Sequence, residues 1–320
     1  MKNKTLSLVL ACILIAGCSS SNPTAQQQDQ LSAAIVNWVG FAPLHIASEL
    51  GYYQDLGLNM DIQVIEDLSA VKSAIQTNQI DLSWGTGDVL MTFADANIDV
   101  KAFYAVDWSN GGDGVVVSSE YNDWADFEGV EFAGQEGFPP SNLFLYALTK
   151  NGIDVSKVTQ TEMDTAAASL AFKAGQLDVA AVYQPYLSEA AKREDGKVFL
   201  TSAEYPYVIT DYFAATPQTL ETKASAISKF VEATNQAIEF IKSNENQAAE
   251  IAAPYFGLST EDALAIFMDV EFPSLEDNKK LFSSEDIKST FQTFEDAMRQ
   301  AGVISNDIDV SNLYTNEFVK

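Results

Sequence analysis

Short runs of apolar and β-branched residues alternate with helical patterns along most of the chain. Residues 33–38 predict a strand, and the following residues predict a helix over 43–50 that begins at a proline. The alternation continues with strands at 60–64, 80–84 and 100–106 and helices at 69–76 and 88–93. Such a succession is typical of α/β proteins with largely parallel sheets.

The alternation starts again after a glycine cluster at residues 111–114. It predicts strands at 115–118, 130–133, 158–162, 177–183 and 208–214, helices at 141–150 and 166–173, and a mainly helical tail at 224–302. Two α/β lobes are the simplest interpretation. We assign residues 31–112 and 207–320 to lobe I and residues 113–206 to lobe II. Two crossings, at 111–114 and near 205–206, would form a hinge around something small.

The first residues have the pattern of a secretory signal. Two lysines precede an apolar run over residues 6–15, which is too short for a stable membrane span. Small residues directly before Cys18 resemble the lipobox of bacterial lipoproteins. We therefore predict a signal peptide at 1–17, a lipid on Cys18 and a flexible tether over 18–30. An ordinary signal cleaved near Gly17, with the cysteine incidental, is the alternative.

Composition narrows the classes of function. The chain has 320 residues, 47% of them apolar, which is enough for two domains with their own cores. It carries 45 acidic and 18 basic residues, a net charge of −27, which argues against a nucleic-acid partner. With one histidine and two cysteines, it is poor in nucleophiles, general bases and soft metal ligands. We expect no enzymatic activity, no metal and no cofactor.

Two loops of lobe I follow predicted strands and lead into helices, where ligands of open α/β sheets bind. The first places two aromatic residues around a glycine, and the second is a glycine-rich turn that ends in an acid. The candidate binding residues are Trp38, Gly40, Phe41, Gly85, Thr86, Gly87 and Asp88. The aromatic residues have an alternative role in the core, and Asp88 has one as a helix N-cap.

A third loop combines acids, an indole and glycines at a predicted crossing between the lobes. Its candidate residues are Asp107, Trp108, Ser109 and Asp113. An ammonium group could lie against the indole and pair with either acid. The alternative is that these acids bond to nearby backbone and shape the turn.

Lobe II contributes two further candidate loops. Phe138, Ser141 and Asn142 open a predicted helix, where the serine could cap the helix or contact a ligand. Tyr183 and Gln184 close the last strand of that lobe. Aromatic rings facing one another from the two lobes would sandwich a flat or small organic molecule.

Three segments carry a resemblance to a known family. Residues 38–44, with the sequence WVGFAPL, followed by ELGYY at 49–53 and GL at 57–58, resemble the opening of the taurine, nitrate and sulfonate group of ABC-importer substrate-binding proteins. This group also includes pyrimidine-precursor binders. Residues 107–113 are similar to the Asp-x-Ser-x-Gly-Ala-Asp segment of a sulfonate-type branch, and residues 183–187 to its Trp-Glu-Pro-Tyr-Leu.

The resemblance implies a type II periplasmic binding protein fold, in which two α/β lobes joined by a two-crossing hinge close on a ligand. It also implies delivery of that ligand to a membrane permease driven by a separate ATPase. The residues that it points to are Trp38, Phe41, Asp107, Ser109, Asp113, Tyr183 and Gln184. The chain departs from the branch at Gln184, where an acid is frequent, and at 138–141, which replaces a Gly-Ser pair.

The charges favour one kind of ligand. Neither Arg193 nor Arg299 lies in a candidate loop, whereas several acids, including Asp211, lie near aromatic loops. We therefore expect a small zwitterion or amine, such as an amino-sulfonate, bound by a monomer anchored at the cell envelope. A thiamine-pyrimidine precursor and a nitrate-like anion are alternative ligands. A sensory lipoprotein is an alternative of another class, and a pyrimidine synthase lacks support because its metal cysteines are missing.

Overall fold

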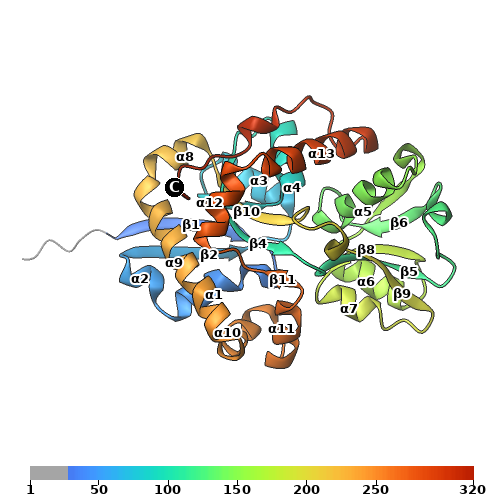
Figure 1. Cartoon of the computed structure of the whole chain (residues 1–320), viewed down its shortest axis with the longest axis horizontal. Helices are drawn as coiled ribbons and strands as arrows, with labels where there is room; N and C mark the ends of the chain where they lie inside the picture. The colour runs from blue at the N-terminus through green and yellow to red at the C-terminus, as the bar shows by residue number, and fades with distance from the viewer. Residues whose placement is uncertain (1–27) are drawn as a thin grey trace, which may run out of the picture.

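The computed structural model describes residues 28–320, so the predicted signal peptide and Cys18 lie outside it. Two mixed β-sheets, each covered by helices, form the two lobes of an α/β protein (Figure 1). The fold predicted from the sequence is confirmed: two α/β lobes are joined by two crossings, as in the type II periplasmic binding proteins.

Lobe I is built on a six-stranded sheet in the order β11-β4-β10-β3-β1-β2. Its strands are β1 (Asp29–Ile35), β2 (Leu58–Val64), β3 (Leu82–Gly85), β4 (Lys101–Ser109), β10 (Thr210–Ala215) and β11 (Val270–Glu271). Its helices are α1 (Ala42–Glu49), α2 (Tyr52–Asp55), α3 (Leu68–Gln76), α4 (Gly87–Asp95), α8 (Pro217–Thr222), α9 (Ala224–Ser243), α10 (Glu245–Ala252), α11 (Thr260–Phe267) and α12 (Leu275–Ser283).

Lobe II is built on a five-stranded sheet in the order β7-β6-β8-β5-β9. Its strands are β5 (Asp113–Ser118), β6 (Glu131–Gly134), β7 (Thr159–Glu162), β8 (Val179–Tyr183) and β9 (Gly196–Thr201). Its helices are α5 (Pro139–Lys150), α6 (Thr165–Lys173) and α7 (Tyr186–Ala190). Short 3₁₀ turns at 39–41, 124–127, 155–157, 202–204, 253–256 and 310–312 complete the two lobes.

The chain crosses between the sheets from β4 to β5 and again from β9 to β10. Strand β5 runs antiparallel to β8 and β9, and β10 runs antiparallel to β3 and β4. The expectation of largely parallel sheets is therefore only partly right: the strands next to the crossings are antiparallel. The chain turns back from each lobe, so the strands at the crossings run in the opposite direction to their neighbours. Hydrophobic periodicity does not predict strand direction.

Helix α13 (Asp286–Ala301) lies along both lobes (Figure 1). On the side of lobe I, Phe291 packs edge to face against Tyr212 of β10 at 5.7 Å between centroids. On the side of lobe II, Phe294 packs against Tyr146 of α5 at 5.8 Å. The helical tail predicted as part of lobe I therefore also contacts lobe II.

Burial explains why the strands and helices form where they do. Residues 102–107 of β4 are all buried, as the almost continuous apolar run predicted. The helical spacing of Ile227, Phe230 and Ile238 places them on one buried face of α9. In contrast, β9 and α7 were not predicted, because both are short and mixed in polarity.

The beginning of the described chain is ordered as a strand rather than as a tether. Strand β1 begins at Asp29, which pairs with Leu58 of β2, so the predicted tether extends two residues too far. The Asp29 carboxylate lies 2.9 Å from the Lys229 ammonium, an attachment between distant residues that local sequence does not show. Among residues 28–320, no helix is long and apolar enough to cross a membrane.

Candidate ligand-binding site

A small cavity lies between the lobes. Its volume is about 20 Å³, space for about one water molecule. The lining residues are Val36, Trp38, Trp84, Asp113, Phe138, Pro139, Tyr183, Ile209 and Asp211. Both lobes supply aromatic rings and carboxylates, which is the composition expected of a site for a small polar molecule.

Two aspartates meet on neighbouring strands of lobe I. Asp107 of β4 and Asp211 of β10 are direct cross-strand partners, and both are buried. Cross-strand partners project from the same face of a sheet, so two carboxyls of like charge are placed together, an arrangement that is unfavourable by itself. The Trp38 indole Nε1 donates to Asp107 Oδ1 at 3.2 Å.

Lobe II adds a third carboxyl opposite an aromatic ring. Asp113, the first residue of β5, is the cross-strand partner of Tyr183 on β8. The Tyr183 ring meets the Trp38 ring at 6.0 Å and 83°, edge to face. The two rings predicted to sandwich a ligand are therefore perpendicular and touch each other in this structure, because a contact across the lobes fixes their orientation.

A fourth buried carboxyl lies where two helices begin. Asp88 is in the first turn of α4, and its Oδ2 accepts a hydrogen bond from Asn142 Nδ2 of α5 at 2.5 Å. The alternative role of Asp88 as an N-cap is wrong, since Thr86 occupies that position. The helix-cap role considered for Ser141 is wrong as well, because Phe138 is the N-cap of α5.

Several buried polar atoms near this cavity have no hydrogen-bond partner. They are Trp84 Nε1, Thr86 Oγ1, Asp88 Oδ1, Asp107 Oδ2, Ser141 Oγ and Asn142 Oδ1. Buried polar groups are normally paired, because an unpaired one costs about 1–3 kcal/mol. The group contains both donors and acceptors, so it can pair with a ligand that offers both.

Burial strongly alters the ionisation of the four acids. It raises the pKa of Asp107 to about 8 and the pKa of Asp113 to about 7. Burial and the charge of Asp107 raise the pKa of Asp211 well above its usual range, and burial also raises the pKa of Asp88. Nearby negative charges raise the pKa of a carboxyl, as burial does. A cation placed among these acids would lower their pKa values again.

The cavity contains no compensating base, since its lining includes neither lysine, arginine nor histidine. The single histidine is elsewhere: His45 stacks on Tyr255 at 4.1 Å, and burial lowers its pKa to about 4. Within residues 28–320, no group of three or more histidine, cysteine or acidic side chains is arranged to hold a metal ion.

The polar residues at the hinge, in contrast, bond to one another. Ser109 Oγ lies 2.7 Å from Ser202 Oγ, and it also accepts from the Asp113 backbone N–H at 3.1 Å. Ser202 Oγ accepts from the Gly111 N–H at 2.8 Å. Ser109, predicted as a ligand contact, thus links the two crossings of the hinge.

Gln184 lies at the edge of the hinge. Its Nε2 donates to Asp269 Oδ2 of lobe I at 3.2 Å, and its Oε1 accepts from the Ser188 N–H at 3.2 Å. The side-chain amide therefore connects the lobes beside the cavity rather than lining it.

Other predicted residues lie away from the cavity lining. Phe41 is buried in the core of lobe I between Trp84 and Phe213. Trp108 points away from Asp107 and packs on Tyr207 at 5.1 Å, so the predicted ammonium position against its indole is not formed. Two neighbours on a strand face opposite sides, which explains the difference between residues 107 and 108.

The glycines of the predicted loops serve close packing. A Cβ at Gly40 would lie 2.2 Å from Asp107 Oδ2, so only glycine lets this turn pass the carboxylate. A Cβ at Gly87 would lie 2.7 Å from the Phe291 ring, so this glycine faces α13. Gly85, at the end of β3, is tight against Leu90 of α4. Residues 85–87 thus form a packing junction, and Thr86, buried between the two glycines, has no partner for its Oγ1. The ligand contact predicted for these residues stays a prediction.

Sequence reasoning missed part of the site. Trp84 ends a predicted strand directly before the glycine-rich turn, and that position was the available signal for its role in the cavity. Val36 and Ile209 carried no signal beyond hydrophobicity. Ser202 and Asp269 lie in segments to which the pattern assigned no function.

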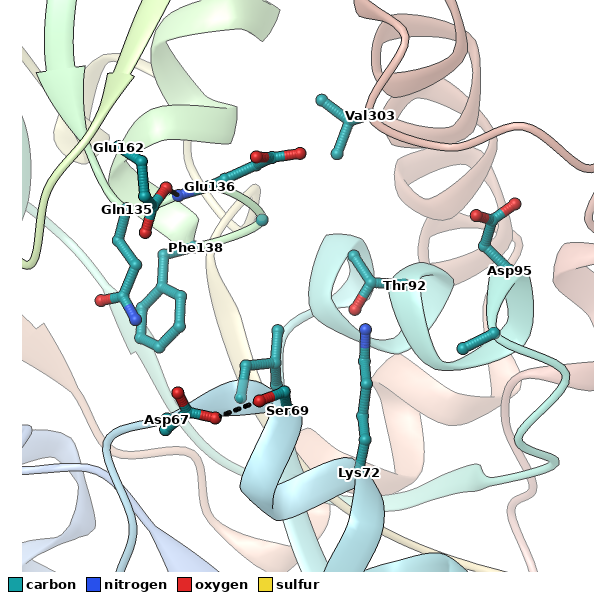
Figure 2. Close-up of a pocket in the computed structure, with 13 residues that line it drawn as sticks. Asp67, Ser69, Lys72, Thr92, Asp95, Gln135, Glu136, Phe138, Glu162 and Val303 are labelled. Carbon is teal, nitrogen blue, oxygen red and sulfur yellow. Dashed lines mark hydrogen bonds between the residues drawn. The ribbon is translucent and has the colours of Figure 1, made fainter.

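A larger groove opens outside the cavity, also between the lobes (Figure 2). Its volume is about 410 Å³. The polar lining includes four carboxylates, from Asp67, Asp95, Glu136 and Glu162, and one base, Lys72. Phe138 lines both the groove and the cavity.

Comparisons with known proteins agree with this fold. Residues 38–248 match the family described as NMT1/THI5 like. A Bacillus subtilis protein described as an aliphatic sulfonates-binding protein is 22% identical over 326 aligned positions, which cover 100% of this chain and 96% of the relative.

Solved structures show the same fold at low sequence identity. The alkanesulfonate-binding protein SsuA from Xanthomonas axonopodis pv. citri, bound to MOPS, has a TM-score of 0.71 at 18% identity, covering 90% of this chain and 98% of that one. The periplasmic nitrate-binding protein NrtA from Synechocystis PCC 6803 has a TM-score of 0.73 at 13% identity, with 91% and 87% covered.

Proposed function

Because the chain belongs to the NMT1/THI5-like family, we propose that it is the substrate-binding component of an ABC importer and that it captures a small amine-bearing solute between its lobes. Its relatives include proteins described as binding sulfonates and nitrate. The proposal assigns this chain a ligand with a cationic group, and the amino-sulfonates are the first candidates.

One observation carries the choice of an amine. Asp107, Asp113 and Asp211 are buried around a cavity whose lining contains no base. A buried carboxylate without a partner is costly, whereas an ammonium group placed among several carboxylates forms strong charge-assisted hydrogen bonds. An anion alone would gain nothing from the charged form of these residues, because their pKa values are raised and it could bind only while they stay protonated.

The other end of the ligand would face donors rather than acids. Trp84 Nε1 and Ser141 Oγ are buried without partners, and α5 begins beside the cavity at Pro139. Pro139 and Pro140 carry no N–H, so the first turn of α5 offers an acceptor oxygen the N–H and hydroxyl of Ser141. A zwitterion whose ammonium lies toward the aspartates and whose oxygens lie toward these donors would use both sets.

We place the protein at the cell envelope. The lipobox-like sequence before Cys18 supports acylation there, and the expected partners are a membrane permease and its ATPase. The binding protein acts as a monomer that closes on its ligand and releases it unchanged. Closure follows from population shift, because a ligand that touches both lobes stabilises the closed form.

Calorimetric titration tests the ligand class. Taurine, an alkyl sulfonate, nitrate and an aminopyrimidine are titrated into the protein at pH 7. We expect micromolar affinity for taurine, about −8 kcal/mol, and no measurable heat with nitrate or the alkyl sulfonate. Tight binding of nitrate alone would overturn the amine proposal.

A pair of variants ties binding to the cavity. Trp38→Ala should weaken binding by about 1–3 kcal/mol, since truncating a buried aromatic residue at a binding site has effects of this size. Trp108→Ala is the matched control, because Trp108 packs on Tyr207 outside the cavity lining. If the Trp108 variant lost affinity and the Trp38 variant did not, the ligand would lie against the Trp108 indole and not in the cavity.

An aminopyrimidine is a second candidate ligand. The specific observation in its favour is the aromatic lining of the cavity, where Trp84 and Phe138 meet at 5.6 Å. A flat ring with an exocyclic amine could stack there and still donate to an aspartate. Preferential binding of the aminopyrimidine in the titration would select this ligand over taurine.

A further inference from the structure

Two hollow spaces lie one behind the other between the lobes. The outer groove has a volume of about 410 Å³ and the buried cavity about 20 Å³. Phe138 is the single residue that lines both. Because this ring belongs to both linings, it separates the open groove from the buried cavity; Figure 2 shows the ring among the residues of the groove.

The cavity is too small for a ligand while this ring stays in place. Pockets for small organic ligands measure hundreds of cubic ångströms. The Phe138 ring packs against Trp84 of the other lobe at 5.6 Å and is 2% exposed, so it is inserted between the lobes. With the lobes in this arrangement, admission of a ligand requires that this ring leave Trp84.

The backbone around Phe138 is a turn and not a regular element. Gly137 has φ +75°, a conformation that favours glycine, and the turn is held by a hydrogen bond from the Phe138 N–H to the Gln135 carbonyl at 3.3 Å. Glu162 Oε2 accepts from the Glu136 N–H at 2.6 Å and fixes the turn at its other end (Figure 2). The side chain of Phe138 can change rotamer without disrupting a helix or strand.

The groove in front of the ring is lined mainly by negatively charged side chains. Its four carboxylates face one ammonium, that of Lys72. A cleft lined by one sign of charge concentrates ions of the opposite sign and raises their rate of association. The groove therefore matches the cavity: both are acidic, and both favour a cation.

We propose that the acidic groove is the entrance to the site and that Phe138 is its gate. Glu136 and Glu162 steer cationic solutes to the gate, and rotation of the phenyl ring admits them to the cavity. The inference rests on the proposed function only in placing the ligand in this cavity, and its test uses no ligand.

Collisional quenching of tryptophan fluorescence measures passage through the gate. The chain has four tryptophans, and Trp108→Phe with Trp124→Phe leaves Trp38 and Trp84, which both line the cavity. The full chain with these two changes is quenched by acrylamide, caesium and iodide at constant low ionic strength. We expect Phe138→Ala to raise the acrylamide quenching constant at least 3-fold, and Phe138→Leu to raise it less.

The charge variants test steering. In the Phe138→Ala background, Glu136→Gln with Glu162→Gln should lower caesium quenching about 2-fold, raise iodide quenching and leave acrylamide unchanged. Glu120→Gln with Glu128→Gln, exposed acids of lobe II outside the groove lining, is the control with the same change of charge. Equal effects of the two pairs would overturn steering.

The two parts of the proposal fail separately. Acrylamide quenching that is unchanged in both Phe138 variants would overturn the gate. A cooperative thermal transition, recorded for each variant, shows that increased quenching does not arise from unfolding. If only Phe138→Ala loses the cooperative thermal transition, the acrylamide quenching of Phe138→Leu decides whether the gate exists. None of these outcomes bears on whether taurine binds, so the gate can fail while the proposed function stands.

Discussion

The hinge and the cavity are two clusters of buried polar groups between the same lobes, and they differ in how they are paired. At the hinge, Ser109 and Ser202 bond to each other and to backbone N–H groups of the first crossing. Around the cavity, Asp107 Oδ2 and Trp84 Nε1 are buried with no partner. Sequence position does not separate the clusters, since Asp107 and Ser109 are two residues apart.

The difference shows what each cluster contributes. A fully paired network stabilises one arrangement of the chain, and the hinge network joins the two crossings. Unpaired groups reduce stability by themselves, so the cavity is a place where stability is lower than the fold could provide. Such a site is stabilised when a complementary molecule binds, and this links the cavity to function.

The largest expected difference is in the dependence of stability on pH. Burial raises the pKa of Asp107 to about 8 and of Asp113 to about 7, far above the unfolded value near 4. Between pH 4 and these values the folded protein binds more protons than the unfolded chain, so stability falls as pH rises. At about 1.4 kcal/mol per pKa unit, the two groups together should lower the free energy of unfolding by roughly 6 kcal/mol between pH 5 and pH 8.

Calorimetric melting at a series of pH values measures this fall. The double variant Asp113→Asn with Asp211→Asn should flatten the profile, because two of the titrating groups are removed. Hinge residues Ser109 and Ser202 do not titrate, so Ser202→Ala should shift the whole profile down without changing its slope. A wild-type profile that is flat from pH 5 to pH 8 would contradict the assignment of raised pKa values.

Next in size is the effect of one cavity carboxyl on binding. Asp211→Asn keeps the shape of the side chain and removes its charge, so affinity for an amine ligand should fall by about 2–3 kcal/mol, roughly 30- to 150-fold. Stability should stay the same or increase, because the new amide can donate to the unpaired Asp107 Oδ2. Titration calorimetry and thermal melting measure the two quantities.

The matched control for this variant is Asp296→Asn on the exposed face of α13. It makes the same change of charge, so a general effect of net charge would appear in both proteins. Loss of stability in Asp211→Asn, with affinity retained, would mean that the cavity acids are structural like the hinge serines.

A smaller effect is expected at the hinge. Ser202→Ala removes the acceptor of the Gly111 N–H and the partner of Ser109 Oγ. We expect the free energy of unfolding to fall by about 1–2 kcal/mol and affinity to change less than about 3-fold. Ser228→Ala on α9, whose hydroxyl bonds only to its own helix, should cost less than about 0.5 kcal/mol. Chemical denaturation of the two variants separates these values.

The fold could be predicted largely from the sequence because apolar periodicity reports burial directly. The strand at 100–106 was visible as an apolar run and is β4, buried on both faces. Strand β9 escaped because its residues 196–201 are mostly half-exposed and mixed in polarity. The direction of the strands was not predicted correctly, because it depends on the route of the chain between the lobes. No local sequence pattern contains that information.

The site was predictable in its residue types and less so in its geometry. The cavity is lined by three residues that the sequence predicted as ligand contacts: Trp38, Asp113 and Tyr183. Phe41 and Trp108 looked equivalent to Trp38 in sequence, yet one packs in the core and the other on Tyr207. Whether an aromatic residue faces a cavity depends on long-range packing between lobes, and a single sequence does not carry that information.

The smallest expected effect lies at Gln184, between the two clusters. Its amide donates to Asp269 Oδ2 across the lobes at 3.2 Å, where Asp269 is half-buried. If the contact stabilises only the closed form, Gln184→Ala should lower affinity about 2- to 5-fold, up to about 1 kcal/mol, through the population of that form. Gln184→Glu has nearly the same shape but places a carboxylate against Asp269, so its affinity should fall further, and acidification should reduce the difference. Equal affinities for both variants and wild type would show that Gln184 has no part in closure and belongs with the residues that only shape the hinge.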